Sequence, residues 1–441
     1  MSINVAHDVP NPPNQDGTIA SKSEHDSSTD PEIVEYAEPD TKYAWLVAVA
    51  ALLNLATTMG TLNSFGVYQQ YYLNTLYPTS SAVSISWIST LISFCMFVGG
   101  VFTGKLVDKF GFRITCFSGS LVCCIALVLA SFTTQIWQLV LTQGIMLGLG
   151  ASLIFSPSIS VVAQWHTKHR VLATGIAVAG GGIGGMVFSV ATEKIIDNVS
   201  YKWSLRILGI LLFIISGASS MAYKRRIEPA RGSNTRLLLT IARDPRFVCI
   251  ALAVMFINMG YFEPLLYVPT LAVIQSGTQS TSSNIVLVFN AGTTIGRILS
   301  GLISKLLGPA NTNLASNFLC CLFICIFMFG INTVVGYYIF SALFGTISTL
   351  YLAVNTHILA HEFGPQVVAS SVGLSMACCG VGVLVGNPVQ GVLYETYDKG
   401  HTKFNAVSAW AVACFAAATV CYMVLRWLVG RKHNVSWFQN I

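Results

Sequence analysis

The sequence predicts an all-α membrane protein whose twelve transmembrane helices form two parallel six-helix repeats. Composition is the first reason: the chain is 54% hydrophobic and only 10% charged, whereas about 25% of residues are charged in soluble domains. Length is the second, because twelve apolar stretches reach the roughly 20 residues that cross a bilayer. A set of glycines that recurs at a constant offset in the second half of the chain is the third.

Each apolar stretch is expected to be a helix, because an open strand would leave backbone polar groups without hydrogen bonds in lipid. Most Lys and Arg residues fall in the loops on one side of the spans. The positive-inside rule therefore places both termini in the cytoplasm, in agreement with an even number of spans. The spans are expected near residues 44–66, 83–103, 114–133, 136–157, 171–191, 203–222, 247–268, 283–304, 312–332, 335–357, 368–391 and 405–428.

Polar segments divide the chain further. Residues 1–42 are acidic and contain several prolines, a composition typical of disorder. They form either a dispensable solvated arm or a regulatory tail that is phosphorylated near Ser27. The predicted parts are a disordered acidic cytoplasmic tail at 1–42, a six-helix bundle at 43–222, a basic cytoplasmic linker that contacts lipid headgroups at 223–246, a second six-helix bundle at 247–428 and a short cytoplasmic tail at 429–441.

Glycine spacing supports the two repeats. Gly104 and Gly111 bracket a charged loop, and Gly301 and Gly308 keep the same spacing 197 residues later. Because glycine lets membrane helices approach closely, we expect the fifth and eleventh helices to pack at the interface between the halves. Their glycines correspond at an offset of 198 residues: Gly175, Gly182 and Gly184 match Gly373, Gly380 and Gly382.

Two glycine-rich stretches resemble nucleotide-binding loops but lack the required context. Gly180–Gly185 lies inside an apolar span with no preceding strand, and Gly99–Lys105 is followed by Leu106 where a phosphate loop needs Ser or Thr. ATP-driven transport is therefore not predicted, and no cofactor is expected. The net charge of +6 sets membrane orientation and does not indicate a nucleic-acid partner.

Metal sites and enzymatic chemistry are not predicted either. All 12 cysteines lie in apolar spans, where cysteine usually behaves as a small hydrophobe. His357 and His361 share a helix face, but the glutamate of the zinc-protease pattern does not follow His357. We expect these histidines at a helix end, and we expect no metal, no disulfide framework and no catalytic residues.

The loop at residues 104–113, GKLVDKFGFR, resembles the signature of the major facilitator superfamily of secondary transporters. The resemblance implies a twelve-helix fold that works by alternating access. It also implies that Asp108 locks the loop to neighbouring helix ends, with Gly104, Gly111 and Arg113 assisting in gating or coupling.

Further motifs are similar to those of the fungal monocarboxylate-porter-like family. They are Pro39–Trp45, Asn63–Tyr72, Gln143–Ser152 and Asn290–Arg297. Animal members have a lysine at the position of Asn63 and an aspartate at the position of Thr293. This chain keeps only Arg297 of that set, so the resemblance does not fix a substrate.

Two charged residues inside spans are candidates for function. Arg297 is expected to contact an anionic substrate or a gate, or else to make a structural contact near a helix end, because a buried charge in a membrane is costly. Glu263 is followed by Pro264 and Pro269, which predict a broken seventh helix. It is a candidate for proton coupling or for an outer gate.

The resemblance implies that helices one, four, seven and ten face a central cavity. This nominates polar residues for substrate binding, although ordinary helix packing is the alternative for each one: Asn63, Tyr68, Gln143, Tyr261, Tyr351 and Asn355. Asn198 begins a glycosylation sequon in a predicted outer loop, close to the bilayer.

The predicted function is secondary active transport of a small organic solute, monocarboxylate-like or related, with proton coupling left open. The alternative is export of a secondary metabolite, and a non-transporting receptor on the same scaffold is a second alternative. The expected location is the plasma membrane of a fungus. The expected partners are a small-molecule substrate and membrane lipid.

Overall fold

The computed structural model describes residues 38–78, 80, 82–226, 240–276, 279–330, 333–364, 368–398 and 403–433. Most of the predicted tail at 1–42, part of the linker at 223–246 and most of the short tail at 429–441 lie outside these residues. The side chain of Glu263 also lies outside them, although its backbone belongs to a helix.

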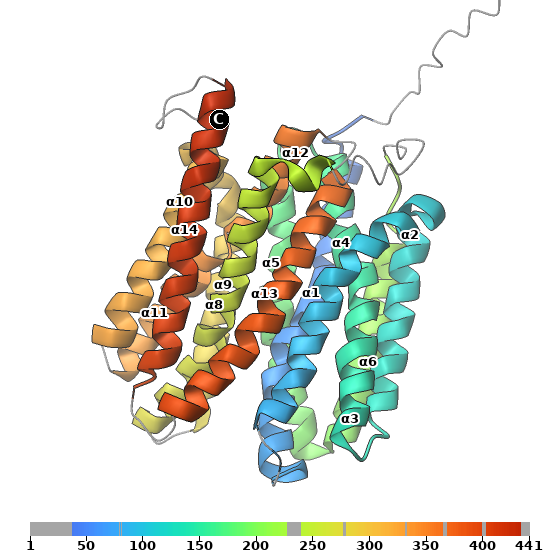
Figure 1. The fold of residues 1–441 in the computed structure, drawn as a ribbon. Coiled ribbons are helices and arrows are strands. Elements are labelled where there is room, and N and C mark those ends of the chain that lie inside the picture. Colours follow the sequence, from blue (N-terminus) through green and yellow to red (C-terminus); the bar gives the residue numbers. More distant parts are fainter. Residues whose placement is uncertain are drawn as a thin grey trace, which may run out of the picture. The chain divides into compact units, whose positions relative to one another are not determined.

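We use "first half" for the helices before residue 227 and "second half" for those after residue 239 (Figure 1). The first half consists of α1 (Lys42–Tyr71), η1 (Tyr72–Leu76), α2 (Ala82–Ala130), α3 (Ile136–Leu139), η2 (Val140–Met146), α4 (Leu147–Trp165), α5 (Arg170–Asn198) and α6 (Tyr201–Ser220). The second half consists of α8 (Pro245–Ser276), α9 (Gln279–Leu307), α10 (Pro309–Ile324), η3 (Cys325–Gly330), α11 (Val334–Ser348), α12 (Tyr351–Phe363), α13 (Val368–Leu393), η4 (Tyr394–Asp398) and α14 (Asn405–His433).

Helix α2 contains two membrane spans that meet at Gly111. Its 49 residues would extend about 70 Å at 1.5 Å per residue, more than twice the roughly 30 Å of the hydrocarbon core. Gly111 has φ 81° and ψ 167°, a conformation that is open to glycine and costly for other residues. Gly308, at the start of α10, has φ 82° and ψ 149°. The two predicted repeat positions therefore break the chain in the same way.

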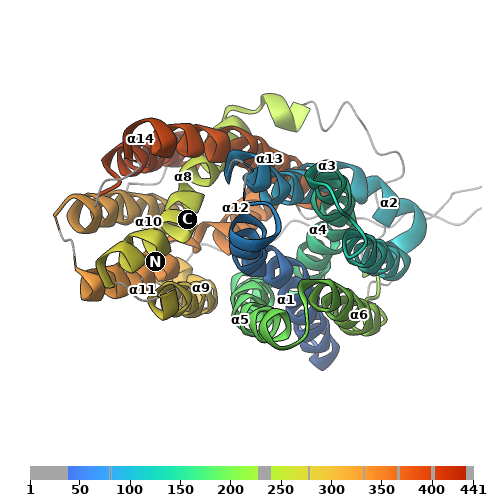
Figure 2. The same cartoon turned by 90° about the horizontal axis from the view of Figure 1, so that it is seen from below.

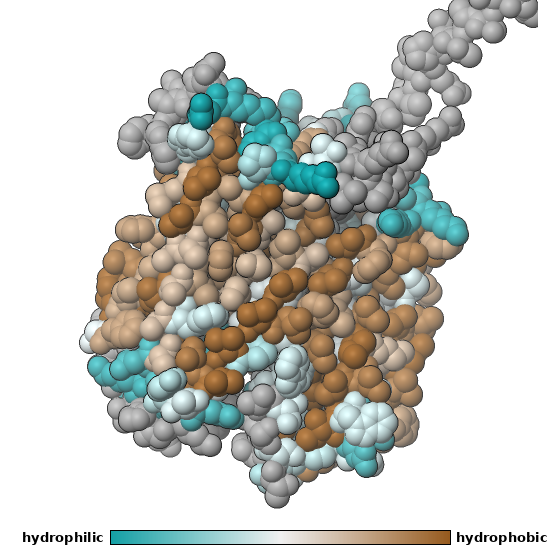
Figure 3. All heavy atoms as spheres, in the orientation of Figure 1, coloured by the Kyte–Doolittle hydropathy of each residue, from teal (hydrophilic) through white to brown (hydrophobic). Residues whose placement is uncertain are grey.

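The described residues contain eleven helices that are long and apolar enough to cross a membrane. Counting α2 as two spans gives twelve crossings, as the sequence predicts. Helices α11 and α12 form one crossing that is interrupted at Thr349, between Ser348 and Tyr351. Large apolar side chains such as Phe102, Phe132 and Leu306 are exposed on the outside of the helices, and Figure 3 shows a broad hydrophobic surface along their length. An exposed apolar surface of this extent is expected where helices contact membrane lipid.

Glycine contacts join the two halves. Helix α5 packs against α9, and α2 packs against α13; Figure 2 shows both pairs end-on. A Cβ on Gly175 would collide with the carbonyl oxygen of Arg297, and a Cβ on Gly373 would lie 2.9 Å from the carbonyl oxygen of Gly100. Gly175 corresponds to Gly373 and Gly100 to Arg297 across the repeat, so the two contacts are equivalent. The expected interface role of the fifth and eleventh helices is confirmed, while the bundle boundaries stay a prediction.

We call the end of the helices that carries the start of α1 and the end of α14 the basic end. It carries Lys105, Lys109, Arg113, Arg225, Arg246 and Lys432, and it is uppermost in Figure 1. At the opposite end, the space-filling view shows a notch between the two halves (Figure 3).

Candidate functional site

Arg297 lies where the two halves meet. Helix α9 carries it to α5, where its Nη1 donates a 2.9 Å hydrogen bond to the backbone carbonyl of Val178. The side chain is only 7% exposed. A Cβ on Gly181 would lie 2.6 Å from Nη1 and 2.7 Å from the Cβ of Met59. The guanidinium therefore packs directly on a glycine of α5.

Most of the hydrogen-bonding capacity of Arg297 is unused within the described part of the chain. A guanidinium carries five N–H donors, and the buried Nε of Arg297 has no partner among the described residues. None of the four ion pairs in the described ranges involves it. The phenols of Tyr261 and Tyr351 are its electrostatic neighbours. The site is thus a buried cation among neutral groups, able to donate to an anion.

Amide and hydroxyl groups surround this cation. Asn63 of α1 donates to the side-chain oxygen of Asn290 of α9 at 3.2 Å and to the carbonyl of Gly181 at 3.3 Å. Thr293 donates to the carbonyl of Asn290 at 2.9 Å. Asn63 and Thr293, at the positions where animal relatives have lysine and aspartate, therefore have neutral side chains. Their hydrogen bonds go to Asn290 and to the carbonyl of Gly181.

Aromatic residues complete the site on the second half. The Tyr351 hydroxyl accepts a 3.2 Å hydrogen bond from Asn258 of α8. The ring of Tyr261 packs against Phe289 of α9, with 6.0 Å between ring centroids. Phenol rings can contact an apolar ligand with their faces and a polar ligand group with their hydroxyls.

Three other nominated residues bind partners within their own half. Tyr68 is 2.8 Å from the hydroxyl of Ser204, and Gln143 accepts a 2.9 Å hydrogen bond from Tyr72. Asn355 accepts a 2.7 Å hydrogen bond from Asn313 and also pairs with Tyr422. None of these hydrogen bonds involves Arg297. The role of the three residues in substrate binding stays a prediction, as does the role of Glu263.

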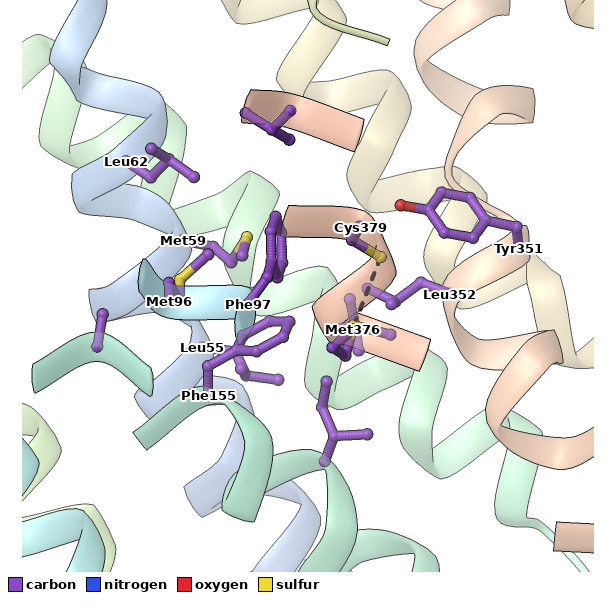
Figure 4. Packing of buried hydrophobic residues seen from close by; sticks show 14 of the residues in the cluster. Leu55, Met59, Leu62, Met96, Phe97, Phe155, Tyr351, Leu352, Met376 and Cys379 are labelled. Atoms are coloured by element: carbon purple, nitrogen blue, oxygen red, sulfur yellow. Dashed lines mark hydrogen bonds between the residues drawn. The ribbon is translucent and has the colours of Figure 1, made fainter. Parts of the chain in front are cut away.

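A cluster of buried apolar side chains, which we call the apolar plug, includes residues of both halves. It consists of Leu55, Met59, Met96, Phe97 and Phe155 from the first half and Leu352, Met376 and Cys379 from the second (Figure 4). Phe97 contacts the glycine position Gly380 across the interface. Because Gly181 touches both Met59 and Arg297, the cation forms the edge of the plug.

The loop between the two spans of α2 lies at the basic end, where arginine side chains hydrogen-bond to backbone carbonyls. Arg225 donates to the backbone carbonyls of Val107 and Asp108, the latter at 3.0 Å. Arg113 donates to the carbonyl of Tyr223. The Asp108 side chain is exposed, with Arg225 as its charged neighbour. Gly104 has open space around it. The gating roles predicted for this loop stay predictions.

Asp40 anchors the start of α1 to the loop between α4 and α5. Its carboxylate accepts hydrogen bonds from the Thr167 hydroxyl at 2.6 Å and from the backbone N–H groups of Thr167 and Lys168 at 3.2 and 3.1 Å. Burial acts to raise the pKa of the Asp40 carboxyl, but these hydrogen bonds outweigh it and lower the pKa to about 2. The sequence showed Asp40 only as part of a family motif.

A second cluster at the basic end was not predicted. The Glu362 carboxylate of α12, only 2% exposed, pairs with Arg246 of α8 and with Lys432 of α14, the latter at 2.9 Å. Arg246 also pairs with Asp244 at 2.7 Å. His361 Nδ1 lies 3.6 Å from the same carboxylate, so this histidine sits at the helix end as expected. Within the described ranges, no three metal-ligating side chains converge.

Asn198 lies at the end of α5, on the opposite end of the molecule. Its side chain is exposed and donates to the carbonyl of Lys194 at 2.8 Å. Its modification stays a prediction.

The fold and the paired interfaces define a membrane transporter built from two related halves that meet around a central site. The model of the Major Facilitator Superfamily matches residues 44–386, and the chain belongs to this superfamily. It is a secondary transporter and an integral multi-pass membrane protein, and it is not an enzyme. The superfamily prediction is confirmed, while the narrower monocarboxylate-porter branch stays a prediction.

Comparisons with individual proteins agree with membership of this superfamily. The aspyridones efflux protein apdF of Emericella nidulans is 29% identical over 356 residues, which cover 80% of this chain and 72% of apdF. The agnestins efflux protein AgnL12 of Paecilomyces divaricatus is 29% identical over 382 residues, which cover 87% of each chain. A crystal structure of the nucleoside transporter NupG aligns with a TM-score of 0.67 over 87% of this chain and 99% of NupG, at 14% identity. The NupG match shows the fold alone.

Proposed function

We propose that this protein exports an amphipathic organic metabolite that carries an anionic group. The observation that carries the proposal is Arg297, a buried cation with an unpartnered Nε and only neutral neighbours among the described residues. A desolvated anion gains strong charge-assisted hydrogen bonds from such a guanidinium. The printed names of two relatives, apdF and AgnL12, describe efflux proteins and support the direction.

The lining of the site supports a substrate larger than a simple monocarboxylate. The phenols of Tyr261 and Tyr351 neighbour the cation. The ring of Phe289 packs against Tyr261, and Met59 contacts the same glycine position, Gly181, as the guanidinium. These groups offer apolar and aromatic contact area, which a short carboxylate would leave unused. An aromatic acid would use both parts of the site.

The orientation that we propose places the basic end in the cytoplasm of the cell, with the plasma membrane as the location. In this arrangement the apolar plug and the α5–α9 and α2–α13 contacts form the cytoplasmic gate. The notch at the opposite end then faces outward. Rocking of the halves around Arg297 would alternate access between the two sides.

Uptake of a short monocarboxylate is the second candidate. The same Arg297 supports it, because any carboxylate can pair with a guanidinium. The two candidates differ in which acid the site accepts, so one assay with two acids separates them.

The test measures transport of tritiated 2-naphthoate and of labelled lactate in proteoliposomes that contain the purified full-length chain. We expect 2-naphthoate to move and Arg297→Gln to lower its rate at least tenfold, since hydrogen bonds to charged groups are worth about 1.5–3 kcal/mol. Arg206→Gln is the matched control, because Arg206 lies in α6 and donates to Ser131 within the first half. Lactate movement without 2-naphthoate movement would favour the second candidate, and movement of neither acid would overturn both.

A further inference from the structure

Every described polar group that faces the substrate site keeps one charge across the physiological pH range. Arg297 stays a cation, because a guanidinium ordinarily titrates above pH 12. Its neighbours Tyr261 and Tyr351 carry phenols, which ordinarily titrate near pH 10. Asn63, Asn290 and Thr293 have no titratable proton in water and are hydrogen-bonded to one another or to backbone.

The described charged groups on the helices around Arg297 lie toward the helix ends. On α5, Arg170 is eight residues before Val178 and Glu193 is twelve after Gly181, which places them about 12 and 18 Å away along the helix. On α9 itself, Lys305 lies eight residues, or about 12 Å, beyond Arg297. Three other helices carry site residues: α1 begins with Lys42 at the basic end, α8 carries Arg246 near its basic end, and α12 carries His357, His361 and Glu362. The nearest of these to a site residue is His357, which lies six residues, or about 9 Å along the helix, after Tyr351.

A coupled proton needs a group in or beside the site whose proton occupancy differs between the two faces of the membrane. No described residue around Arg297 provides such a group. Binding of a monoanion would neutralise the guanidinium, and its release would restore the positive charge. One negative charge would then cross the membrane in each transport event.

We propose that the substrate crosses as an anion without a co-transported proton, so that the membrane potential drives its export. The inference rests on the proposed function, because it requires an anionic substrate at Arg297. An inside-negative potential pushes a monoanion outward, and a potential of 100 mV supports a concentration ratio of roughly fifty-fold. The site needs no acid for this mode of transport.

Glu263 offers the direct challenge to this inference. It lies in α8 two residues after Tyr261, and its side chain is outside the described residues. If its carboxylate exchanged a proton with each substrate, transport would be electroneutral. The charge carried per substrate in a Glu263→Gln variant therefore discriminates between the two mechanisms.

The experiment sets a potassium diffusion potential with valinomycin across proteoliposomes that have the same pH on both sides. Tritiated 2-naphthoate and tritiated naphthalene-2-sulfonate are the probes, and the sulfonate binds no proton at neutral pH. We expect the equilibrium distribution of a transported probe to change about tenfold per 60 mV, with the same charge per substrate in wild type and Glu263→Gln. A pH gradient imposed at zero potential should not drive net movement of the sulfonate.

The other outcomes are also decisive. Accumulation of naphthalene-2-sulfonate that follows the pH gradient and ignores the potential would overturn the inference and leave the proposed function standing. A charge per substrate that is near zero in wild type and one in Glu263→Gln would also overturn it and would assign the proton to Glu263. If neither probe moves in protein that elutes as a monodisperse peak, the proposed function itself fails.

Discussion

Arg297 of α9 joins the two halves by donating a 2.9 Å hydrogen bond to the carbonyl of Val178 on α5. The repeat-related position is Gly100, which faces Gly373 with backbone alone. One of two otherwise equivalent interfaces therefore carries a cation. If Arg297 binds a substrate anion, as we propose, that anion would compete with the Val178 carbonyl for the guanidinium. The same side chain would then hold the halves together and respond to the substrate.

Loss of this hydrogen bond should favour separation of the halves at the basic end. In Arg297→Gln, we expect the equilibrium to shift toward that state by about 1.5–2 kcal/mol, the lower part of the range for a hydrogen bond to a charged group. Spin labels at Lys109 and Arg431, one on each half, would report this shift as a longer distance population. Arg206→Gln carries the same labels as the control, and an equal shift in that variant would contradict the assignment.

Gly181 should be intolerant of a side chain. In Gly181→Ala, the new Cβ would lie 2.6 Å from Arg297 Nη1 and 2.7 Å from the Cβ of Met59, so the guanidinium must leave its position. We expect a tenfold or greater fall in 2-naphthoate transport. Gly66→Ala is the control, because nothing lies within 4 Å of that position. Wild-type transport by Gly181→Ala would show that the guanidinium position does not matter.

Much of the fold could be predicted from the sequence, because it depends on local properties. Apolar runs of bilayer length located the spans, and the repeated spacing of Gly111 and Gly308 located the two matching breaks. The cost of a charge in lipid identified Arg297. Each of these signals is contained in a short stretch of chain.

The rest of the site depends on how helices rotate and on contacts between distant residues. Tyr68, Gln143 and Asn355 lie on helices expected to face the cavity, but a rotation about the helix axis directs them to partners in their own half. Glu362 pairs with Arg246, 116 residues away in sequence, and with Lys432, 70 residues away. No local sequence pattern predicts how a helix is rotated or which distant residues form an ion pair.

The Glu362 cluster should contribute strongly to stability. In Arg246→Met, the buried Glu362 carboxylate loses its partner on α8, and removal of one member of a buried pair typically costs about 3–5 kcal/mol. Because Lys432 still contacts this carboxylate, we expect the lower end, about 3 kcal/mol. The midpoint of thermal unfolding in detergent measures the loss. Lys305→Met, at an exposed position of α9, is the control and should change the midpoint little.

The Asp40 anchor should give a pH-dependent contribution to stability. Its pKa is about 2 in the folded protein, below the ordinary value of 3.8. A lowered carboxyl pKa stabilises the fold above the unfolded value, and this contribution is lost as the pH falls from about 4 toward 2. The difference in unfolding midpoint between wild type and Asp40→Asn should therefore be constant above pH 5 and shrink below pH 4. A difference that grows on acidification would contradict the hydrogen-bonded anchor.

The break at Gly111 should depend on backbone conformation rather than on space. No atom lies within 4 Å of the position where a Cβ would be added, yet φ is +81°. Steric crowding is therefore not the reason for glycine at this position. With φ 81° and ψ 167°, the backbone lies in a region that is essentially restricted to glycine, so the expected cost of Gly111→Ala is about 1–3 kcal/mol from the backbone conformation alone. Gly104→Ala lies seven residues earlier with equally open surroundings and ordinary helical backbone, so it should not destabilise the fold. Thermal unfolding of both variants decides the point: equal midpoints would mean that the turn relaxes without strain, whereas a lower midpoint for Gly111→Ala alone assigns the cost to the positive φ.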